Sequence, residues 1–303
     1  MRSDFVSSNC EKNAQTAGLT DSYQRHREMV MQLISSTVKD LLGTSGEKCS
    51  SLVLLGAGNC MDVDLPKLTE LFKMIHLVDL DSAAAVTAVE RSEGNADQFK
   101  IHAPVDIAEP LLSLTSRDLR AEEDNREQCI KVLQALSAEN AVHEIPEADV
   151  VISLCVFTQM IDCLCSLIPE GHPTFTNALK AIRIGHLRRM LSMLRPGGVA
   201  IFVTDTASSK TAPILHKATD ATIAEIVKQL VVDKNFYSGT NPAMLLADLN
   251  VLSRLPNGPD TVHTTDPWIW HIDERALATY AFRIQKKLPV KEETEMADVP
   301  ESN

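Results

Sequence analysis

Residues 51–81 read SLVLLGAGNCMDVDLPKLTELFKMIHLVDLD, and this stretch decides the fold. An apolar run at 52–55 is typical of a buried strand, and it stops at the glycine-containing turn 56–59. An amphipathic segment follows and predicts a helix, and a second apolar run at 75–78 predicts a strand that ends at Asp79. Strand, glycine turn, helix, strand and acid is the order of a nucleotide-binding crossover.

The glycine turn is an incomplete form of the dinucleotide-binding motif. Gly56 and Gly58 allow backbone N–H groups to approach a ligand, but Met61 stands where a third glycine is usual. The carboxylate of Asp79 can accept hydrogen bonds from two ribose hydroxyls. The alternative to a nucleotide site is a plain tight turn after a strand, and the residues further along the chain decide between the two.

Composition narrows the class of protein. The chain has 303 residues, 44% of them hydrophobic, which suffices for a sizeable core in one α/β domain with insertions. A net charge of −12 disfavours a sequence-independent grip on nucleic acid, which needs clustered Lys and Arg. An acidic balance is also common in ordinary soluble enzymes.

The cysteines and the ends of the chain bear on location. Seven cysteines without framework spacing indicate free thiols in a reducing compartment. Cys163 and Cys165 have no second pair at zinc spacing, so no metal site is predicted. No apolar stretch approaches the ~20 residues of a membrane span, and the first 18 residues lack the apolar centre of a secretory signal. We therefore expect a cytoplasmic protein.

The periodicity predicts one domain at 21–287, between a disordered N-terminus at 1–20 and a disordered acidic tail at 288–303. The parts of this domain are an N-terminal helix at 21–43, a core at 51–204, an insert at 205–261 and a closing hairpin at 268–284. In the core, further strands are expected at 99–103, 149–154 and 199–204, with helices at 82–91, 111–138 and 175–194 between them.

Alternating strands and helices predict an α/β fold with a doubly wound, mostly parallel seven-stranded sheet. The terminal hairpin would add an antiparallel edge. Ligands of such sheets bind at the carboxyl ends of the strands.

Five features stand in a characteristic order within 51–204. They are LLGAG after the first strand, VDLD at the second, VD after the third, an apolar fourth strand that runs into 155–160, and RPGG before the fifth. This order resembles the class I, Rossmann-like, S-adenosylmethionine-dependent methyltransferases. The RPGG turn separates the resemblance from NAD enzymes.

The resemblance implies S-adenosylmethionine as cofactor and S-adenosylhomocysteine as product. It assigns the ribose hydroxyls to Asp79 and the adenine amino group to Asp106, with the sulfonium near the end of the fourth strand. The implied cofactor positions are Gly56, Ala57, Gly58, Asn59, Asp79, Leu80, Val105, Asp106, Ile107, Cys155, Val156 and Phe157.

Two positions depart from the family pattern, because Leu54 replaces a usual acid and Cys60 a usual glycine. We hypothesise that Asp62 supplies the missing carboxylate to the cofactor's ammonium. Alternatively, Asp62 and Asp64 cap the next helix, which is the favoured interpretation of Asp64.

Three other assigned residues have a purely structural alternative. Asp79 can share a helix cap with Asp81, Asp106 can form a turn after a proline, and Phe157 can belong to the core.

Methyl transfer from a sulfonium needs alignment and exclusion of water, so no fixed catalytic signature is expected. Polar residues near the expected cleft are candidates for substrate contact: Thr158 and Gln159 after the fourth strand, Tyr23 and His26 on the first helix, and Tyr237 in the insert. Trp268 and Trp270 lie on one side of a strand, where core packing is expected.

The favoured function is S-adenosylmethionine-dependent methyl transfer to a small-molecule acceptor. A non-catalytic relative of the fold that binds S-adenosylmethionine or a partner is the alternative, since Leu54 and Cys60 depart from the pattern. An NAD-dependent oxidoreductase would suit Asp79 but not Met61. The methyl acceptor, the base and the oligomeric state have no sequence signature.

Overall fold

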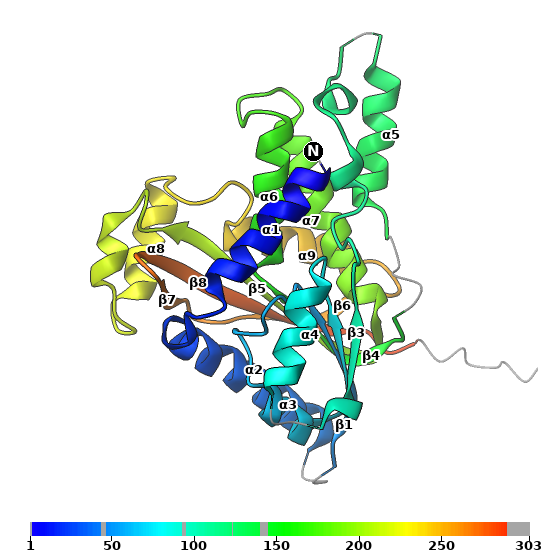
Figure 1. Ribbon diagram of the computed structural model, residues 1–303. Helices are drawn as coiled ribbons and strands as arrows, with labels where there is room; N and C mark the ends of the chain where they lie inside the picture. The colour runs from blue at the N-terminus through cyan, green and yellow to red at the C-terminus, as the bar shows by residue number, and fades with distance from the viewer. Residues whose placement is uncertain (1, 44–46, 93–94, 123, 140–144, 290–303) are drawn as a thin grey trace, which may run out of the picture.

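A twisted sheet with helices on both faces forms the centre of the molecule (Figure 1). The computed structural model describes residues 2–43, 47–92, 95–122, 124–139 and 145–289. Among these residues no helix is both long and apolar enough to pass through a membrane.

The strand order is β3-β2-β1-β4-β5-β8-β6, with β7 also paired to β8. The strands are β1 (Cys49–Leu55), β2 (Phe72–Val78), β3 (Phe99–His102), β4 (Ala148–Leu154), β5 (Leu194–Ser208), β6 (Pro259–Thr264), β7 (Trp268–Ile272) and β8 (Arg275–Lys286). The pairs from β3 to β5 are parallel, and β8 runs antiparallel to β5. The predicted fold class and the closing hairpin are confirmed.

Eight strands fill seven positions because β6 and β7 share one edge. Thr264 pairs with Phe282, and Trp268 pairs with Thr279 further along the same strand β8. The first half of β6 falls in the predicted insert at 205–261, and no strand was expected there. Its residues PDTVHT are mostly exposed and polar, as an edge strand permits, so they carry no apolar signal.

Alternate residues of each parallel strand face opposite helical layers. Val53 and Leu55 pack toward α5 (Arg126–Ser137), α6 (Val156–Leu167), α7 (Phe175–Ser192) and α9 (Pro242–Leu252). Leu52 and Leu54 pack toward α2 (Gln24–Leu42), α3 (Leu65–Leu71) and α4 (Ser82–Arg91). A third apolar cluster lies under α8 (Ile223–Val232).

The N-terminal segment differs from the prediction of disorder at 1–20. It forms α1 (Arg2–Thr16), which crosses the molecule between α4 and α6 (Figure 1). The apolar periodicity of this helix is weak, and polar contacts to the glycine turn hold it in place, so the sequence alone carried no signal. The helix expected at 21–43 begins as a 3-10 turn at Thr20–Tyr23 and ends at Gly43, as expected.

The helix expected at 111–138 is wrong over its first half. Of the described residues in this range, only those of α5 are α-helical. Thr115 donates both its backbone N–H and its hydroxyl to Asp118, which favours a short turn at the start of the range. The RPGG turn lies inside β5, where the register with β4 shifts between Ala148 and Val150. Of the predicted acidic tail, residues 290–303 lie outside the described residues.

Candidate functional site

The turn after β1 is shaped by a close approach to α6. Gly56 adopts φ +73°, and a Cβ there would lie 2.2 Å from Cγ2 of Val156. The N–H groups of Gly56 and Ala57 both donate to the carbonyl of Val78, which folds the turn over the end of β2. Only glycine fits this position, because the side chain of Val156 already fills the space beside its Cα.

Asp79 stands directly after β2 and faces this turn. Its two carboxylate oxygens accept the N–H groups of Gly58 and Asp81, each at 2.8 Å. Asp81, rather than Asp79, caps α4 by accepting from the N–H of Ala84 at 3.1 Å. A carboxylate has about four acceptor sites, so Asp79 retains capacity for hydroxyl donors. Burial raises its pKa above the ordinary value.

A small cavity of about 100 Å³ lies between the glycine turn and the start of α6. Seven of the positions that the resemblance assigned to the cofactor line it: Gly56, Gly58, Asp79, Leu80, Asp106, Ile107 and Val156. The carboxylate of Asp106 also accepts the N–H of Ala108 at 2.8 Å, so it makes the turn that was the alternative interpretation. We call this space the cradle cavity.

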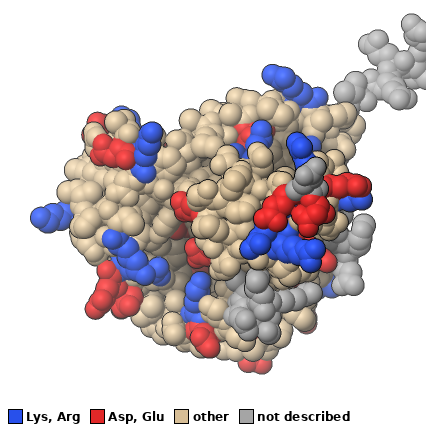
Figure 2. Space-filling view, turned by 90° about the horizontal axis from the view of Figure 1, so that it is seen from above, with Lys and Arg blue, Asp and Glu red and all other residues tan. Residues whose placement is uncertain are grey.

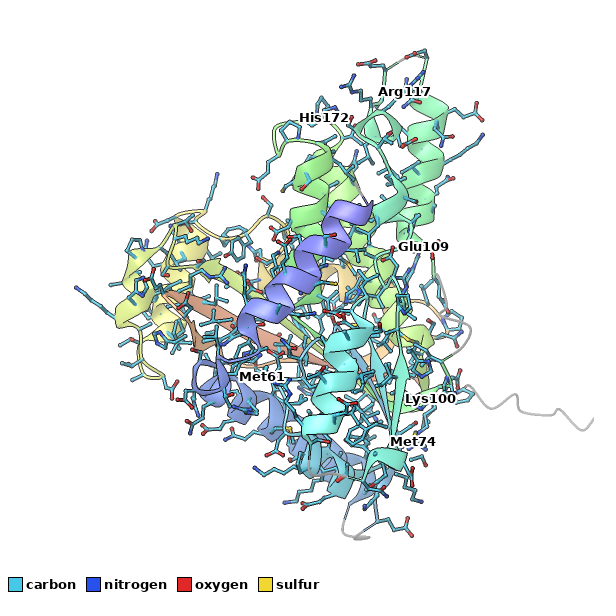
Figure 3. All side chains as sticks on the ribbon, in the orientation of Figure 1. Met61, Met74, Lys100, Glu109, Arg117 and His172 are labelled. Carbon is cyan, nitrogen blue, oxygen red and sulfur yellow. The ribbon has the colours of Figure 1, made fainter. Side chains whose placement is uncertain are left out.

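Helix α1 closes the cradle cavity from outside. The side-chain amide of Asn13 donates to Asp81 at 3.0 Å, and the amide of Asn59 donates to the backbone carbonyl of Asn13 at 2.5 Å. Asn9 and Lys12 line the same space. In Figure 3, Met61 lies below the lower end of this helix, in the loop that follows the glycine turn. Because the N-terminus was predicted to be disordered, none of these contacts of α1 was expected.

A second cavity of about 440 Å³ adjoins the first and is called the acceptor cavity below. Residues from α1, α6, β5, the insert and the hairpin line it. They are Lys12, Asn13, Gln15, Thr16, Tyr23, Cys155, Thr158, Gln159, Ile161, Asp162, Asp205, Tyr237, Trp270, Ile272, Arg275 and Leu277. Lys12, Asn13 and Gln159 line both cavities. Seen from above, acidic side chains occupy the furrow in the middle of this face (Figure 2).

One face of α6 supplies a wall of the acceptor cavity. Cys155, Thr158, Gln159 and Asp162 follow the helical spacing i, i+3, i+4 and i+7, so they face the same side. Cys155 holds a left-handed conformation, φ +51°, at the helix N-cap. Burial first, and then the charge of Asp205, raises the pKa of its thiol, which therefore stays protonated. Asp162 was not predicted as a site residue, although its helical spacing from Cys155 and Thr158 could have indicated it from the sequence.

Asp205 is the most buried acid of the acceptor cavity, with 7% of its surface exposed. The hydroxyl of Thr158 donates to its carboxylate at 3.0 Å. Burial raises the pKa of Asp205, and hydrogen bonds oppose that rise. Asp205 comes one residue after the expected end of the fifth strand, where ligands of such sheets bind, and it was not among the predicted site residues.

Asp62 belongs to a buried polar chain. The indole N–H of Trp268 donates to Nδ1 of His26 at 3.2 Å, and Nε2 of His26 lies 3.1 Å from Oδ1 of Asp62. Because Nδ1 is an acceptor, the neutral imidazole carries its proton on Nε2, toward Asp62. The ring of His26 also stacks on Trp270 at 4.2 Å.

His26 is fully buried and lines neither cavity, unlike the other candidates for substrate contact. The role proposed for Asp62 toward an ammonium stays a hypothesis. Asp64, by contrast, caps α3 as expected, since it accepts the N–H of Lys67 at 3.1 Å.

Several assigned residues lie behind the cavity walls. Ala57, Asn59 and Val105 line neither cavity. Phe157 is fully buried, 5.9 Å from the ring of Phe202, in the core position that was its alternative. Within the described ranges, no group of three or more His, Cys, Asp or Glu residues is placed to hold a metal. His172 lies in the upper part of the view, beyond the upper end of α1 (Figure 3).

No protein-family model matches the sequence, and comparison with curated proteins gives no match. Among solved structures the chain is similar to the N-methyltransferase NodS from Bradyrhizobium japonicum, at 13% identity and a TM-score of 0.39, over 86% of this chain and 96% of that one. It is also similar to an O-methyltransferase family protein from Burkholderia thailandensis, at 12% identity and a TM-score of 0.35, over 91% of this chain and 62% of that one. A third similar structure is a bacterial Hen1 methyltransferase domain, at 12% identity and a TM-score of 0.39, over 82% of this chain and 96% of that one.

The strand order and the single reversed strand β8 decide the architecture. The fold is that of the Rossmann-like methyltransferases. At these identities and TM-scores, the similar structures do not indicate the activity or the acceptor of this protein. The residues of the two cavities are the basis for its function.

Proposed function

We propose that the protein binds S-adenosylmethionine in the cradle cavity and promotes transfer of its methyl group to a small molecule in the acceptor cavity. The observation that carries this proposal is the junction of the two cavities at Gln159, at the carboxyl ends of the parallel strands. Two reactants held on either side of one junction are aligned for direct displacement.

The residues of the cradle cavity suit the cofactor. The backbone of Gly56 and Gly58 lines the cavity, so an extended chain of the cofactor can lie against it. Asp79 keeps acceptor sites for ribose hydroxyls, and Ile107 offers an apolar wall for a flat ring. The bound cofactor would supply an electrophilic methyl group on a sulfonium. The chain itself binds, orients and excludes water.

The cradle cavity is smaller than the roughly 300–1,000 Å³ usual for ligand sites. Asn9, Lys12 and Asn13 of α1 reach into it. Entry of the cofactor therefore requires α1 to shift outward, and its return would shield the junction from water.

The acceptor cavity falls within the usual range for small ligands, which supports a small-molecule acceptor. All seven cysteines are free, which supports a cytoplasmic location.

Calorimetric titration with S-adenosylmethionine, S-adenosylhomocysteine and NAD in parallel tests the proposal. We expect micromolar binding of the first two and none of NAD. Binding of NAD alone, or no binding of the sulfonium cofactor, would overturn it. Turnover of an acceptor, followed by release of S-adenosylhomocysteine, then separates an enzyme from a binding-only relative.

A further inference from the structure

The charges of the acceptor cavity are arranged by depth. The buried carboxylate of Asp205 lies at its floor, while Lys12, Asp162 and Arg275 are exposed and lie at its rim. A ligand that enters far enough to reach the junction with the cradle cavity therefore meets the carboxylate of Asp205 last, after a rim that carries two basic groups and one acid.

The floor is built to keep a carboxylate available to a ligand. Thr158 donates one hydrogen bond to Asp205, and the protonated thiol of Cys155 interacts with the same carboxylate. No Lys or Arg side chain among the described residues forms an ion pair with Asp205. A buried carboxylate without a cationic partner is costly, and a ligand cation would lower that cost.

Aromatic rings form the wall above the floor. Tyr23 and Trp270 meet edge to face with their centroids 5.1 Å apart, and Tyr237 lines the cavity from the insert. The electron-rich faces of such rings attract cations as well as apolar groups. Burial and the charge of Asp205 raise the pKa of Tyr237, which keeps its hydroxyl neutral.

The basic residues of the rim are available to an anion. Within the described part of the chain, neither Lys12 nor Arg275 forms an ion pair. Asp162 is exposed at the rim but partly surrounded by protein, which raises its pKa, and the nearby charges of Lys12 and Arg275 oppose that rise. A guanidinium and an ammonium at one opening suit a carboxylate or similar anionic group.

We propose that the acceptor is a small amine that also carries an anionic group, with its ammonium on Asp205 between the aromatic rings and its anion toward Arg275 and Lys12. This inference rests on the proposed function for the role of the amine as methyl acceptor, but binding of the amine does not require the cofactor. Asp205 takes the one proton that the ammonium nitrogen releases, which leaves the nitrogen lone pair free to react.

Calorimetry with matched probes tests the charge pattern. The probes are 4-(2-aminoethyl)benzoate, 2-phenylethylamine, 3-phenylpropionate and 2-phenylethanol, each titrated with and without S-adenosylhomocysteine. We expect 4-(2-aminoethyl)benzoate, the amino acid, to bind at least tenfold more tightly than the amine 2-phenylethylamine. The amine should in turn bind more tightly than the acid 3-phenylpropionate or the alcohol 2-phenylethanol.

Equal or tighter binding of the acid or the alcohol would overturn the inference and point to another acceptor class. If S-adenosylhomocysteine binds and none of the probes does, the inference fails while the proposed cofactor site stands. If the amino acid binds in the expected order and S-adenosylhomocysteine does not bind, the amine site stands and the proposed function fails.

Two variants locate the charges. Asp205→Asn is nearly isosteric, and we expect it to weaken both amine probes at least tenfold without weakening the acid. Arg275→Gln should reduce binding of the amino acid to the level of the simple amine. Arg254→Gln is the control, since Arg254 is exposed and lines neither cavity. Unchanged amine binding in a folded Asp205→Asn protein would contradict the assignment.

Discussion

The cradle cavity and the acceptor cavity are built in opposite ways. The first uses mainly backbone and main-chain-bonded groups from the ends of neighbouring strands, with Gly56 and Asp79 at its centre. The second uses side chains from α1, α6, β5, the insert and the hairpin. A site made by a local turn is encoded in a short motif, whereas a site made by distant side chains is encoded only in the whole fold. Variants in one cavity should therefore leave ligand binding in the other unchanged.

Gly56→Ala should have the largest effect on the cradle cavity. The new Cβ would lie 2.2 Å from Val156, and the φ of +73° adds strain of about 1–3 kcal/mol. We expect loss of measurable binding of S-adenosylhomocysteine and a lower melting temperature. Gly171→Ala is the control, because nothing lies within 4 Å of a Cβ there. Normal cofactor binding by Gly56→Ala would show that the turn is not the ligand site.

Asp79→Asn should weaken the cofactor while leaving the acceptor cavity intact. A hydrogen bond to a charged group contributes about 1.5–3 kcal/mol, so we expect binding of S-adenosylhomocysteine to fall about 10- to 100-fold. The amine probes should bind as before, because Asp79 does not line their cavity. A parallel loss of probe binding would mean that the two cavities do not act separately.

Asp205→Asn should change the pH dependence of stability. Burial raises the pKa of Asp205 above 3.8, so between 3.8 and the folded value the folded protein binds more protons than the unfolded chain. The free energy of unfolding contributed by this group therefore falls as pH rises through that window. We expect urea unfolding from pH 4 to 8 to show the variant gaining stability over the parent protein as pH increases. If the parent protein instead gains stability over the variant as pH rises, a cationic group must pair with Asp205 at the floor of the acceptor cavity.

Asn13→Ala should loosen the helix that covers both cavities. It removes a hydrogen bond to the carboxylate of Asp81, a contribution of about 1.5–3 kcal/mol. We expect severalfold faster cleavage of α1 by a protease and faster association of S-adenosylhomocysteine in stopped-flow measurements. Ser8→Ala, at an exposed position of the same helix, is the control. Unchanged association would mean that the cofactor enters without displacing α1.

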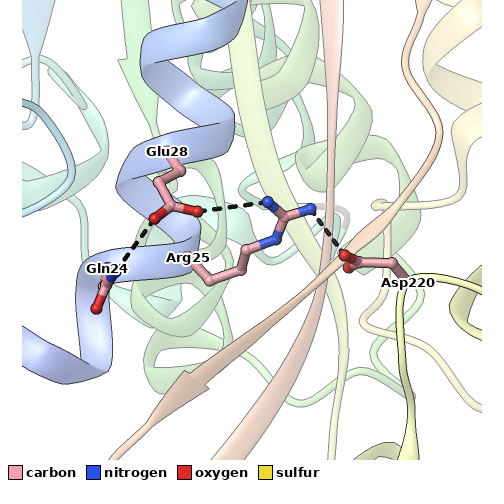
Figure 4. Close-up of polar contacts among 4 residues, drawn as sticks. All are labelled: Gln24, Arg25, Glu28 and Asp220. Atoms are coloured by element: carbon pink, nitrogen blue, oxygen red, sulfur yellow. Dashed lines mark hydrogen bonds and ion pairs between the residues drawn. The ribbon is translucent and has the colours of Figure 1, made fainter.

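Asp220→Asn should have the smallest effect. Arg25 at the start of α2 contacts Glu28 at 3.4 Å and Asp220 at 2.8 Å, which ties that helix to the insert (Figure 4). Gln24 adds a hydrogen bond to Glu28 at 3.2 Å. Exposed ion pairs contribute little, so we expect less than about 0.5 kcal/mol in urea unfolding and unchanged probe binding. A loss of probe binding would show that this link positions the wall that contains Tyr23.

The sequence predicted the elements whose signals are local. The apolar strands, the turn at Gly56, the helix stop at Gly43 and the cap at Asp64 each depend on residues close together in the chain. The same locality explains why Asp79 could be assigned to the end of a strand before any contact was known.

The contacts that the sequence did not predict arise only when distant segments meet. Asn13 lies on a helix with little apolar periodicity, and it reaches Asp81 across 68 residues. Trp270 packs as the core residue it was expected to be, and it also lines the acceptor cavity beside Tyr23. Arg275 follows a hairpin turn whose position over the cavity depends on the pairing of β7 with β8.

A crystal structure of the complex with S-adenosylhomocysteine tests the division into two cavities most directly. We expect the ribose hydroxyls within hydrogen-bond distance of the Asp79 carboxylate, α1 displaced outward from its present contacts, and the sulfur at the junction beside Gln159. A ligand bound elsewhere, or bound with Asp79 out of reach of the ribose, would contradict the proposed cofactor site and the methyl transfer that depends on it.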